Sequence, residues 1–419
     1  MIVNNDKSYL YLELNTWTND TNGIYDYSTD AIKTVKASIS EPTYIVRTKN
    51  NSFKNISQHA DIEGEKGNEL IFYVNNGSKN KFVLINPIPY HLKLTQENIS
   101  YLHNKMWYVL KSDELDEKIK IDNEDYYLNQ NDIIKLGRVK YAIQELHIES
   151  KEISNGAPPS AIIENKYDIY KLNQNLEPVF DFVYVIKEKE PLQNETPEGQ
   201  ECRLCKDKKM NINKETDDGE SNPLICVCKC KDNKYHYKCL KNYIKDNEIK
   251  VINQESIIDD AKVLKNFECD ECKQQFPLKF KYENSDKIYN LYDYEVPSQG
   301  DYIILESLDC KESEAYIKYI HIIKLLKEYI YIGREIDNDV NNKGISISRK
   351  HAVMRYDKEN GRVSLQNLSK KYGTLVLVRK PIKVLHKFIY LQNGRTFIGA
   401  CLKDKEELKQ NENMNKINK

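Results

Sequence analysis

The chain has 419 residues, of which 40% are hydrophobic and 30% are charged, and its formal net charge is -1. At roughly 100–200 residues per domain, this length predicts two to four domains. The balance of charges excludes a strongly basic surface, so we do not expect nucleic acid as a partner. The sequence lacks an apolar run long enough to cross a membrane and a signal peptide at its start, so we expect a cytoplasmic or nuclear protein without a membrane partner.

The first 200 residues predict β-structure followed by a linker. Short runs of β-branched and aromatic residues, such as 69–74 and 81–85, are bounded by Asn, Gly and Ser, which is typical of strands and turns. We therefore expect a β-rich domain over residues 1–150. Residues 151–200 combine charges, prolines and one strand-like run at 182–186, which predicts a linker that contains a strand.

An internal similarity links this region to the end of the chain. The segment from Tyr127 to Gly137 resembles the segment from Tyr390 to Gly399, because each has a short apolar strand, a polar turn and a second apolar strand that ends in Gly. Either the two segments are unrelated hairpins, or the chain holds two copies of one β-sandwich, of which the first is degenerate.

Eight of the ten cysteines lie between positions 202 and 272. A gap of two residues between two cysteines lets both reach one zinc ion at about 2.3 Å. In a chain without a secretion signal, such pairs more often bind metal than form disulfides. Two four-ligand zinc sites are predicted from Cys202, Cys205, Cys228, Cys230, His236, Cys239, Cys269 and Cys272. Cys226 is a ninth candidate, which would replace Cys230 if the second pair is Cys226 and Cys228.

The ligand order, four cysteines, one histidine and three cysteines, resembles the RING-variant (RING-CH) fingers of a family of ubiquitin ligases. The resemblance covers residues 201–281, and the stretch between Cys239 and Cys269 is longer than the family usually has. No membrane-spanning pair follows, so the membrane tethering of that family is not expected. The residues that carry the resemblance are Asn222–Ile225, Cys228, Cys230, Tyr235–Leu240 and the aromatic Tyr243.

The resemblance implies two structural zinc ions that are held in an interleaved, cross-brace arrangement. The first site would take Cys202, Cys205, His236 and Cys239, and the second site would take the other four ligands. Such a finger has no catalytic nucleophile, because it binds a ubiquitin-loaded conjugating enzyme and holds the thioester in a reactive pose. The resemblance assigns Leu204 to the contact with that enzyme, and the alternative role for Leu204 is packing between the zinc loops.

Plant-homeodomain fingers, which read histone tails, share this ligand order. The five residues between Cys230 and His236, and an aromatic residue, Phe267, two places before Cys269, also fit that family. The sequence around Leu240 favours the RING variant. A non-enzymatic reader or scaffold is therefore the alternative function.

Three motifs lie between strand-like runs in residues 302–404. They are Ile332–Arg334, Ser346–His351 and Leu368–Thr374. In sequence and spacing they resemble the forkhead-associated (FHA) domain, a β-sandwich that binds phosphothreonine peptides through loops at one end. The preceding residues, 282–301, predict a linker, and residues 405–419 lack an apolar stripe and predict a disordered tail.

The FHA resemblance assigns phosphate binding to three residues. Arg334 would give the phosphate a planar, charge-assisted fork, Ser348 would donate its hydroxyl, and Arg349 would add positive charge. His351 would brace the loop by hydrogen bonds without touching phosphate. Tyr372 stands where family members commonly have an Asn that holds the peptide backbone, so a degenerate sandwich used for scaffolding is the alternative.

Taken together, the patterns predict a mixed, multidomain and mainly β protein, with an FHA-type sandwich and a small cross-brace zinc finger. In the two-copy interpretation, residues 1–150 form a degenerate FHA-like sandwich. The predicted function is that of a RING-type ubiquitin ligase. Its partners would be a ubiquitin-conjugating enzyme and phosphothreonine-containing proteins, which the FHA domain recruits.

Overall fold

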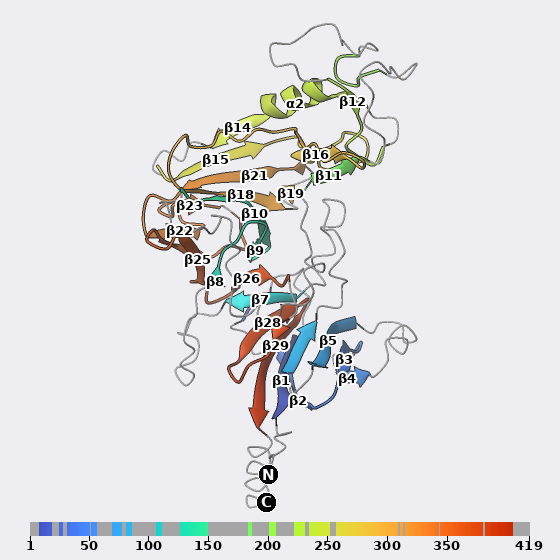
Figure 1. Cartoon of the computed structure of the whole chain (residues 1–419), viewed down its shortest axis with the longest axis vertical. Coiled ribbons are helices and arrows are strands. Elements are labelled where there is room, and N and C mark those ends of the chain that lie inside the picture. The colour runs from blue at the N-terminus through green and yellow to red at the C-terminus, as the bar shows by residue number, and fades with distance from the viewer. Residues whose placement is uncertain are drawn as a thin grey trace, which may run out of the picture.

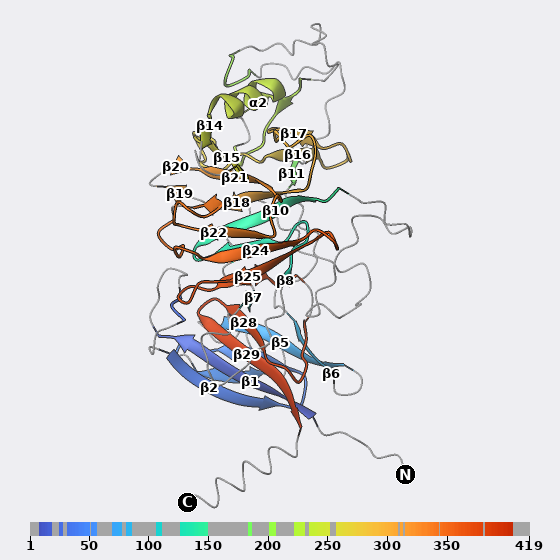
Figure 2. The ribbon, with the colours of Figure 1, turned by 90° about the vertical axis from the view of Figure 1, so that its left-hand side faces the viewer.

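The computed structural model describes residues 8–18, 25–27, 32–50, 52–56, 69–77, 81–85, 106–110, 126–149, 183–186, 201–206, 222–230, 234–251, 257–308, 311–312, 315–342, 344–379 and 382–404. Within these ranges the chain is elongated and mainly β, with one α-helix, α2 (Tyr237–Asp246) (Figures 1 and 2). The prediction of a mainly β fold is confirmed. The predicted tail and most of the predicted linker at 151–200 lie outside the described residues.

A single 12-stranded sheet connects most of the molecule. In spatial order its strands are β14 (Glu248–Val251), β15 (Asp259–Leu264), β21 (Lys318–Lys324), β18 (Tyr302–Leu308), β10 (Val139–His147), β9 (Ile133–Leu136), β26 (Thr374–Leu377), β7 (Met106–Leu110), β28 (Ile389–Asn393), β29 (Thr396–Asp404), β1 (Ser8–Trp17) and β2 (Ile32–Ile39). Strands from the two ends of the chain therefore alternate within one sheet.

Two five-stranded sheets pack on this long sheet and make two β-sandwiches. The first sandwich adds β27 (Ile382–Lys383), β6 (Lys81–Ile85), β5 (Glu69–Gly77), β3 (Thr43–Arg47) and β4 (Phe53–Ile56), and the second adds β23 (Val340–Asn341), β22 (Tyr329–Gly333), β24 (Ala352–Asp357), β25 (Arg362–Asn367) and β8 (Tyr126–Tyr127). In the first sandwich Arg47 donates a buried hydrogen bond to Thr396 across the layers. In the second sandwich, the side-chain amide of Asn342 donates a buried hydrogen bond to the hydroxyl of Tyr141. Apolar side chains of both layers form one continuous core.

The two sandwiches exchange their closing hairpins. The hairpin β9–β10 comes from the N-terminal half of the chain, yet it lies between β26 and β18, which both come from the C-terminal half. The hairpin β28–β29 makes the reverse exchange and lies between β7 and β1. Strands β7 and β26 pair with each other where the two exchanges meet. Outward from this pair, each side of the sheet continues with a hairpin from the other half of the chain, which is followed by β18 and β21 on one side and by β1 and β2 on the other.

The two closing hairpins have the same turn. Leu136 pairs with Val139 around Gly137 and Arg138, and Asn393 pairs with Thr396 around Gly394 and Arg395. Each glycine has a positive φ, 61° and 52°, which a two-residue hairpin turn requires and which glycine adopts without strain. Gly137 is therefore equivalent to Gly394, whereas the sequence similarity had placed it opposite Gly399.

The cysteine-rich region is built on small sheets around α2. These are β12 (Leu224–Ile225) with β13 (Tyr235–His236), and β11 (Val183–Ile186) with β16 (Lys279–Tyr282) and β17 (Tyr289–Asn290). A further pair, β19 (Lys311–Glu312) with β20 (Ala315–Tyr316), follows β18. The region has its own aromatic core, in which the rings of Phe280 and Tyr289 stack at 4.9 Å.

The hairpin β14–β15 fuses this region to the second sandwich, because β15 pairs with β21 along six residues from Asp259 to Leu264. A buried polar contact reinforces the junction, because His321 Nδ1 of β21 lies 2.8 Å from Asp259 Oδ2 of β15. Beside it, Lys318 Nζ of β21 donates to Glu306 of β18 at 2.5 Å.

The strand pairing differs from the predicted division into domains. Residues 1–150 and 302–404 do not form separate sandwiches, because each segment supplies the hairpin that closes the other. The hairpin β14–β15 falls within 201–281 but belongs to the long sheet. Part of the predicted linker at 282–301 is packed, since Leu291 is fully buried. Pairing partners far apart in the sequence explain these differences, because local patterns do not specify them.

Candidate metal centres and phosphopeptide loops

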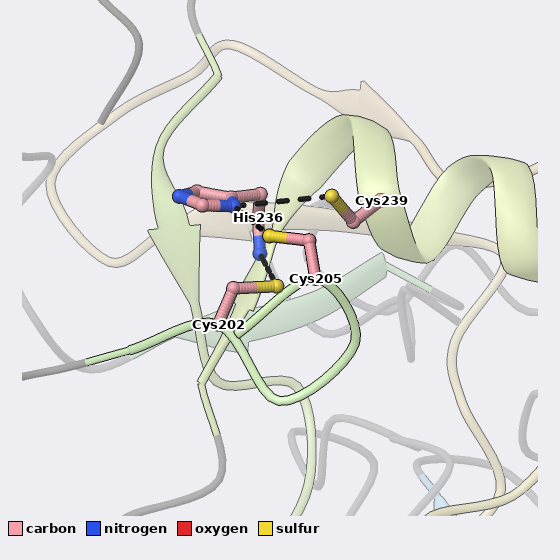
Figure 3. A group of neighbouring side chains, drawn as sticks. All are labelled: Cys202, Cys205, His236 and Cys239. Carbon is pink, nitrogen blue, oxygen red and sulfur yellow. Dashed lines mark hydrogen bonds between the residues drawn. The ribbon is translucent and has the colours of Figure 1, made fainter. Parts of the chain in front are cut away.

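The first candidate metal centre gathers Cys202, Cys205, His236 and Cys239 (Figure 3). The Nδ1 atom of His236 lies 3.3 Å from Cys205 Sγ and 3.8 Å from Cys239 Sγ. Cys239 lies in the first turn of α2, three residues after His236, so both side chains lie on one face. The backbone N–H of His236 donates to Cys202 Sγ at 3.3 Å, as expected for an amide that supports a metal-binding thiolate.

The second candidate centre gathers Cys228, Cys230, Cys269 and Cys272. The sulfur atoms of Cys230 and Cys269 are 3.9 Å apart, and the hydroxyl of Tyr235 lies 3.9 Å from Cys269 Sγ. In the sequence, Cys228 and Cys230 lie between the two pairs of the first group, and Cys269 and Cys272 follow the first group. The two groups therefore interleave, as the predicted cross-brace requires.

Cys226 lies outside both groups. Its thiol donates to the backbone carbonyl of Cys230 at 2.6 Å and also contacts the thiol of Cys228. The group that the structure brings together contains Cys228 and Cys230, the first of the two alternatives left by the sequence, and Cys226 is not a member of it.

Two tight turns of the same kind present the first and the last cysteine pairs. Lys206 follows Cys205 and donates to the carbonyl of Cys202 at 2.8 Å, and Lys273 follows Cys272 and donates to the carbonyl of Cys269 at 3.0 Å. Both lysines have a positive φ, 60° and 56°. This conformation is costly for a residue with a Cβ and is typically retained at functional sites.

The donor sets fit zinc. In a tetrahedral site with zinc–sulfur bonds near 2.3 Å, neighbouring sulfur atoms are about 3.8 Å apart, and the separation of 3.9 Å between the sulfur atoms of Cys230 and Cys269 is close to this value. Burial raises the pKa of Cys239 and of Cys230 to about 12, so both thiols hold their protons at neutral pH unless a cation is present. These eight residues would hold two metal ions with closed, structural coordination shells.

Leu204 lies at the tip of the first cysteine turn. It is 38% exposed. Its neighbour Arg203 reaches across to the last cysteine turn, where it pairs with Asp270 at 2.8 Å and with Glu271 at 2.5 Å. The guanidinium also lowers the pKa of Asp270. The two turns are thereby held side by side, with Leu204 presented between polar residues.

Phe267 is buried in the core of this region. It is 1% exposed, packs edge-on against Phe276 at 6.2 Å and lies under Lys318 Nζ at 5.7 Å. A direct contact between Phe267 and a bound peptide is therefore excluded in this conformation, and its position before Cys269 has a packing reason.

Arg334 follows β22 at one end of the second sandwich, and its side chain is exposed. Its backbone is fixed, because Arg334 N donates to Ser348 O at 3.0 Å and Asn341 donates to the Arg334 carbonyl at 3.2 Å. Within the described part of the chain, its guanidinium makes no hydrogen bond or ion pair. Arg349 is also exposed, and its Nε lies 3.8 Å from a carboxylate oxygen of Glu335.

Ser348 joins two loops of this end. Its hydroxyl lies 2.7 Å from the hydroxyl of Ser369, in the loop between β25 and β26. Ser369 also accepts a hydrogen bond from Tyr372 N at 3.2 Å. Ser369 was not predicted to belong to the site, although it lies inside the motif at 368–374. The signal in the sequence for Ser369 as a site residue is its hydroxyl group within that motif.

His351 braces both loops, as the resemblance implied. Its Nδ1 accepts from Ser348 N at 3.0 Å, and its Nε2 lies 2.9 Å from Gly373 O. Burial lowers the pKa of His351 to about 4, so the ring is neutral at physiological pH, with Nε2 as the donor. Gly373 has a φ of 64°, which accounts for a glycine at this turn.

The exchanged hairpin β9–β10 contacts the loop that carries Ser348. The backbone N–H of Arg138 donates to Ser346 Oγ at 3.0 Å. A Cβ on Gly137 would lie 2.2 Å from Ser346 O, so no larger residue fits there. The loop that carries Ser348 therefore rests on residues more than 200 positions earlier in the chain.

Comparison with protein families identifies an FHA domain at residues 330–398. This match supports a role in binding phosphothreonine-containing peptides. It begins in β22 and ends in β29, so it extends across both sandwiches, and it does not include the hairpin β9–β10. The comparison with curated proteins and the comparison with solved structures gave no significant match. Within the described residues, no helix is long and apolar enough to span a membrane.

Proposed function

We propose that the chain is a zinc-dependent, RING-type ubiquitin ligase that selects phosphothreonine-containing targets through its FHA domain. The observation that carries the ligase proposal is the pair of interleaved four-ligand groups, with Leu204 exposed on the first cysteine turn. Two zinc ions bound there would hold the cysteine turns in place. The proposed partners are a ubiquitin-conjugating enzyme and phosphorylated proteins, in the cytoplasm or the nucleus.

The role of the cysteine-rich region is to position a partner rather than to react. Seven of its cysteines are proposed as metal ligands, so they are not available as nucleophiles. Leu204 would insert into an apolar site of the conjugating enzyme. The ion pairs of Arg203 with Asp270 and Glu271 would supply a polar rim around this contact. Holding the thioester in a productive pose is a recognised source of rate enhancement.

The phosphopeptide site would use Arg334, Ser348 and Arg349, as the motifs indicate. Support comes from the exposed guanidinium of Arg334, which makes no hydrogen bond or ion pair to the described residues, and from Ser348, whose hydroxyl contacts Ser369 and whose backbone N–H donates to His351. A phosphate with nearly two negative charges would gain a charge-assisted fork from Arg334, and such bonds are about twice as strong as neutral ones.

The strand pairing that joins the two regions gives the proposal a geometric consequence. The hairpin β14–β15 belongs both to the cysteine-rich region and to the long sheet of the second sandwich. A target bound at the FHA loops would therefore be held at a set distance from the conjugating enzyme, which raises the effective concentration of its lysines near the thioester.

A discharge assay tests the ligase proposal. Loaded conjugating enzymes from a panel are mixed with the wild-type chain, with Leu204→Ala, or with Leu326→Ala, a matched control because Leu326 is 65% exposed near the end of β21. We expect discharge with the wild type and with the control, and a loss of at least tenfold with Leu204→Ala. Two bound zinc ions without discharge by any panel member would instead favour the non-enzymatic reader or scaffold.

A binding assay tests the phosphopeptide site. We expect Arg334→Ala to abolish binding of phosphothreonine peptides, whereas Arg355→Ala, which removes an exposed arginine from β24 of the same sandwich, leaves it intact. Equal affinity in the wild type and Arg334→Ala would reject Arg334 as the phosphate ligand.

A further inference from the structure

A short segment of the first sandwich touches the phosphopeptide loop of the second. Residues 25–27, which lie between β1 and β2, reach the loop that runs from β25 to β26. The backbone N–H of Tyr27 donates to the carbonyl of Lys371 at 2.8 Å. Close beside this bond, Asp26 Oδ2 lies 3.4 Å from Lys371 Nζ.

Tyr27 is anchored and cannot move away easily. Its ring packs edge-on against Trp17 at 5.2 Å and against Phe397 at 5.7 Å, and its hydroxyl bonds to Gln392. The Nε1 of Trp17 also donates to the carbonyl of Asp26 at 2.9 Å. The ring of Tyr27 lies so close to Gly373 that an added Cβ would be 3.0 Å away. The segment is thus a fixed part of the loop's surroundings.

Lys371 brings a positive charge to the loop that contributes Ser369 to the proposed site. It lies two residues after Ser369, whose hydroxyl touches Ser348, so it shares a loop with the proposed site. Its ammonium is instead held between the carboxylate of Asp26 and the ring of Tyr372, 5.4 Å from the ring centroid. Asp26 also raises the pKa of Lys371, which keeps the lysine charged.

We propose that Asp26 restrains phosphopeptide binding by competing with the phosphate for Lys371, and that this restraint is built into the fold by the first sandwich. This inference rests on the proposed phosphopeptide site. The carboxylate and a phosphate are both anions, so a phosphate that approaches Lys371 must share the ammonium with Asp26 and is repelled by the carboxylate. The first sandwich thereby sets the affinity of a site that it does not itself contain.

Under this proposal, neutralising Asp26 increases the affinity for phosphopeptide. Removing a contact ordinarily weakens a site, whereas neutralising Asp26 frees Lys371 to turn toward the phosphate. Because the ion pair is largely exposed, and such pairs are weak, the gain should be moderate. We expect roughly fivefold tighter binding in Asp26→Asn, and a smaller gain as salt screens the charges.

The test compares four versions of the full chain by their affinity for a degenerate phosphothreonine peptide library and for its unphosphorylated counterpart. They are the wild type, Asp26→Asn, Lys371→Met and the double variant Asp26→Asn with Lys371→Met. Glu41→Gln, which neutralises an exposed acid elsewhere in the first sandwich, controls for net charge. We expect tighter phosphopeptide binding only in Asp26→Asn, and loss of that gain in the double variant.

The outcomes separate the two proposals. If the wild type binds through Arg334 and Asp26→Asn binds equally well or more weakly, the restraint is refuted while the phosphopeptide site stands. A gain that persists when Lys371 is absent would also refute it, because Asp26 would then act through another group. If neither the wild type nor Asp26→Asn binds any phosphopeptide, the phosphopeptide site and the restraint both fail.

Discussion

Gly137 lies directly against Ser346, and a Cβ at Gly137 would stand 2.2 Å from the Ser346 carbonyl oxygen. One residue belongs to the exchanged hairpin from the N-terminal half, and the other begins the motif that carries Ser348. This contact means that the proposed phosphopeptide loop is shaped by a part of the chain outside the FHA match at 330–398.

The first prediction concerns this contact. Gly137→Ala should weaken phosphothreonine-peptide binding by about tenfold or more, because the added methyl group must displace the loop at Ser346, and should lower stability by roughly 1–3 kcal/mol through the strained φ. Peptide titration and denaturant unfolding measure the two effects.

The matched control is Gly394→Ala, at the equivalent turn of the other closing hairpin, where φ is also positive. It should cost similar stability and leave peptide affinity unchanged. Equal losses of affinity in both variants would mean that the effect is one of general destabilisation rather than of the contact with Ser346.

The second prediction concerns the hairpin exchange. A fragment of residues 302–404 contains the whole FHA match but lacks β8, β9 and β10, which lie beside β25, β26 and β18. It should be unfolded or bind phosphothreonine peptide at least tenfold more weakly than the full chain, because an open sheet edge and an uncovered core remain. Circular dichroism and peptide titration of the fragment are the measurements.

A permuted chain in which residues 126–149 follow residue 379 should recover both folding and binding, since it joins β26 to its observed partner β9. A contiguous fragment 302–404 that folds and binds phosphothreonine peptide as tightly as the full chain would contradict the exchange. In that case β28 and β29 would have closed the second sandwich themselves.

The third prediction concerns metal content. The wild-type chain should bind two zinc ions, and Cys230→Ser should bind one, because a four-ligand centre loses a donor. Cys226→Ser should retain two, since Cys226 is not a member of either four-ligand group. Metal analysis of purified protein measures this, and chelation should unfold the region around α2. One zinc ion in Cys226→Ser and two in Cys230→Ser would reverse the assignment.

The fourth prediction is a pH dependence that arises from His351. Burial lowers its pKa to about 4, below the value near 6.5 in the unfolded chain, so the unfolded state binds more protons between these values. The His351 contribution is therefore fully favourable above about pH 6.5 and is lost as the pH falls toward 4, by about 3 kcal/mol in total. NMR titration of the imidazole should give a midpoint near 4, and a midpoint near 6.5 would show that the ring is not buried as described.

Sequence patterns reveal the local features of this protein and miss the non-local ones. The pairs Cys202 with Cys205 and His236 with Cys239 can be inferred from their spacing, because short turns bring the members of each pair together. The joining of the two pairs in one site was implied by the resemblance to RING-variant fingers, and the bracing role of His351 by the resemblance to FHA domains. The mainly β fold could also be predicted from short β-branched runs between turn residues.

The hairpin exchange could not be predicted, because Gly137-Arg138 and Gly394-Arg395 specify the same turn and either hairpin matches either sandwich. The long stretch before Cys269 looked like a departure from the finger, and it is the hairpin β14–β15 that pairs with a strand elsewhere. The contact of Asp26 with Lys371 likewise joins positions in two sandwiches, and no local pattern marks it.

The most direct test of the account is ubiquitin transfer to a lysine-containing phosphothreonine peptide library, with a conjugating enzyme that the chain discharges. The account predicts that ubiquitin-bearing peptides are enriched in phosphothreonine, that Arg334→Ala removes the enrichment while keeping discharge, and that Leu204→Ala removes transfer altogether. Transfer that ignores phosphorylation, or that survives in Leu204→Ala at the wild-type rate, would contradict a phosphorylation-directed ligase.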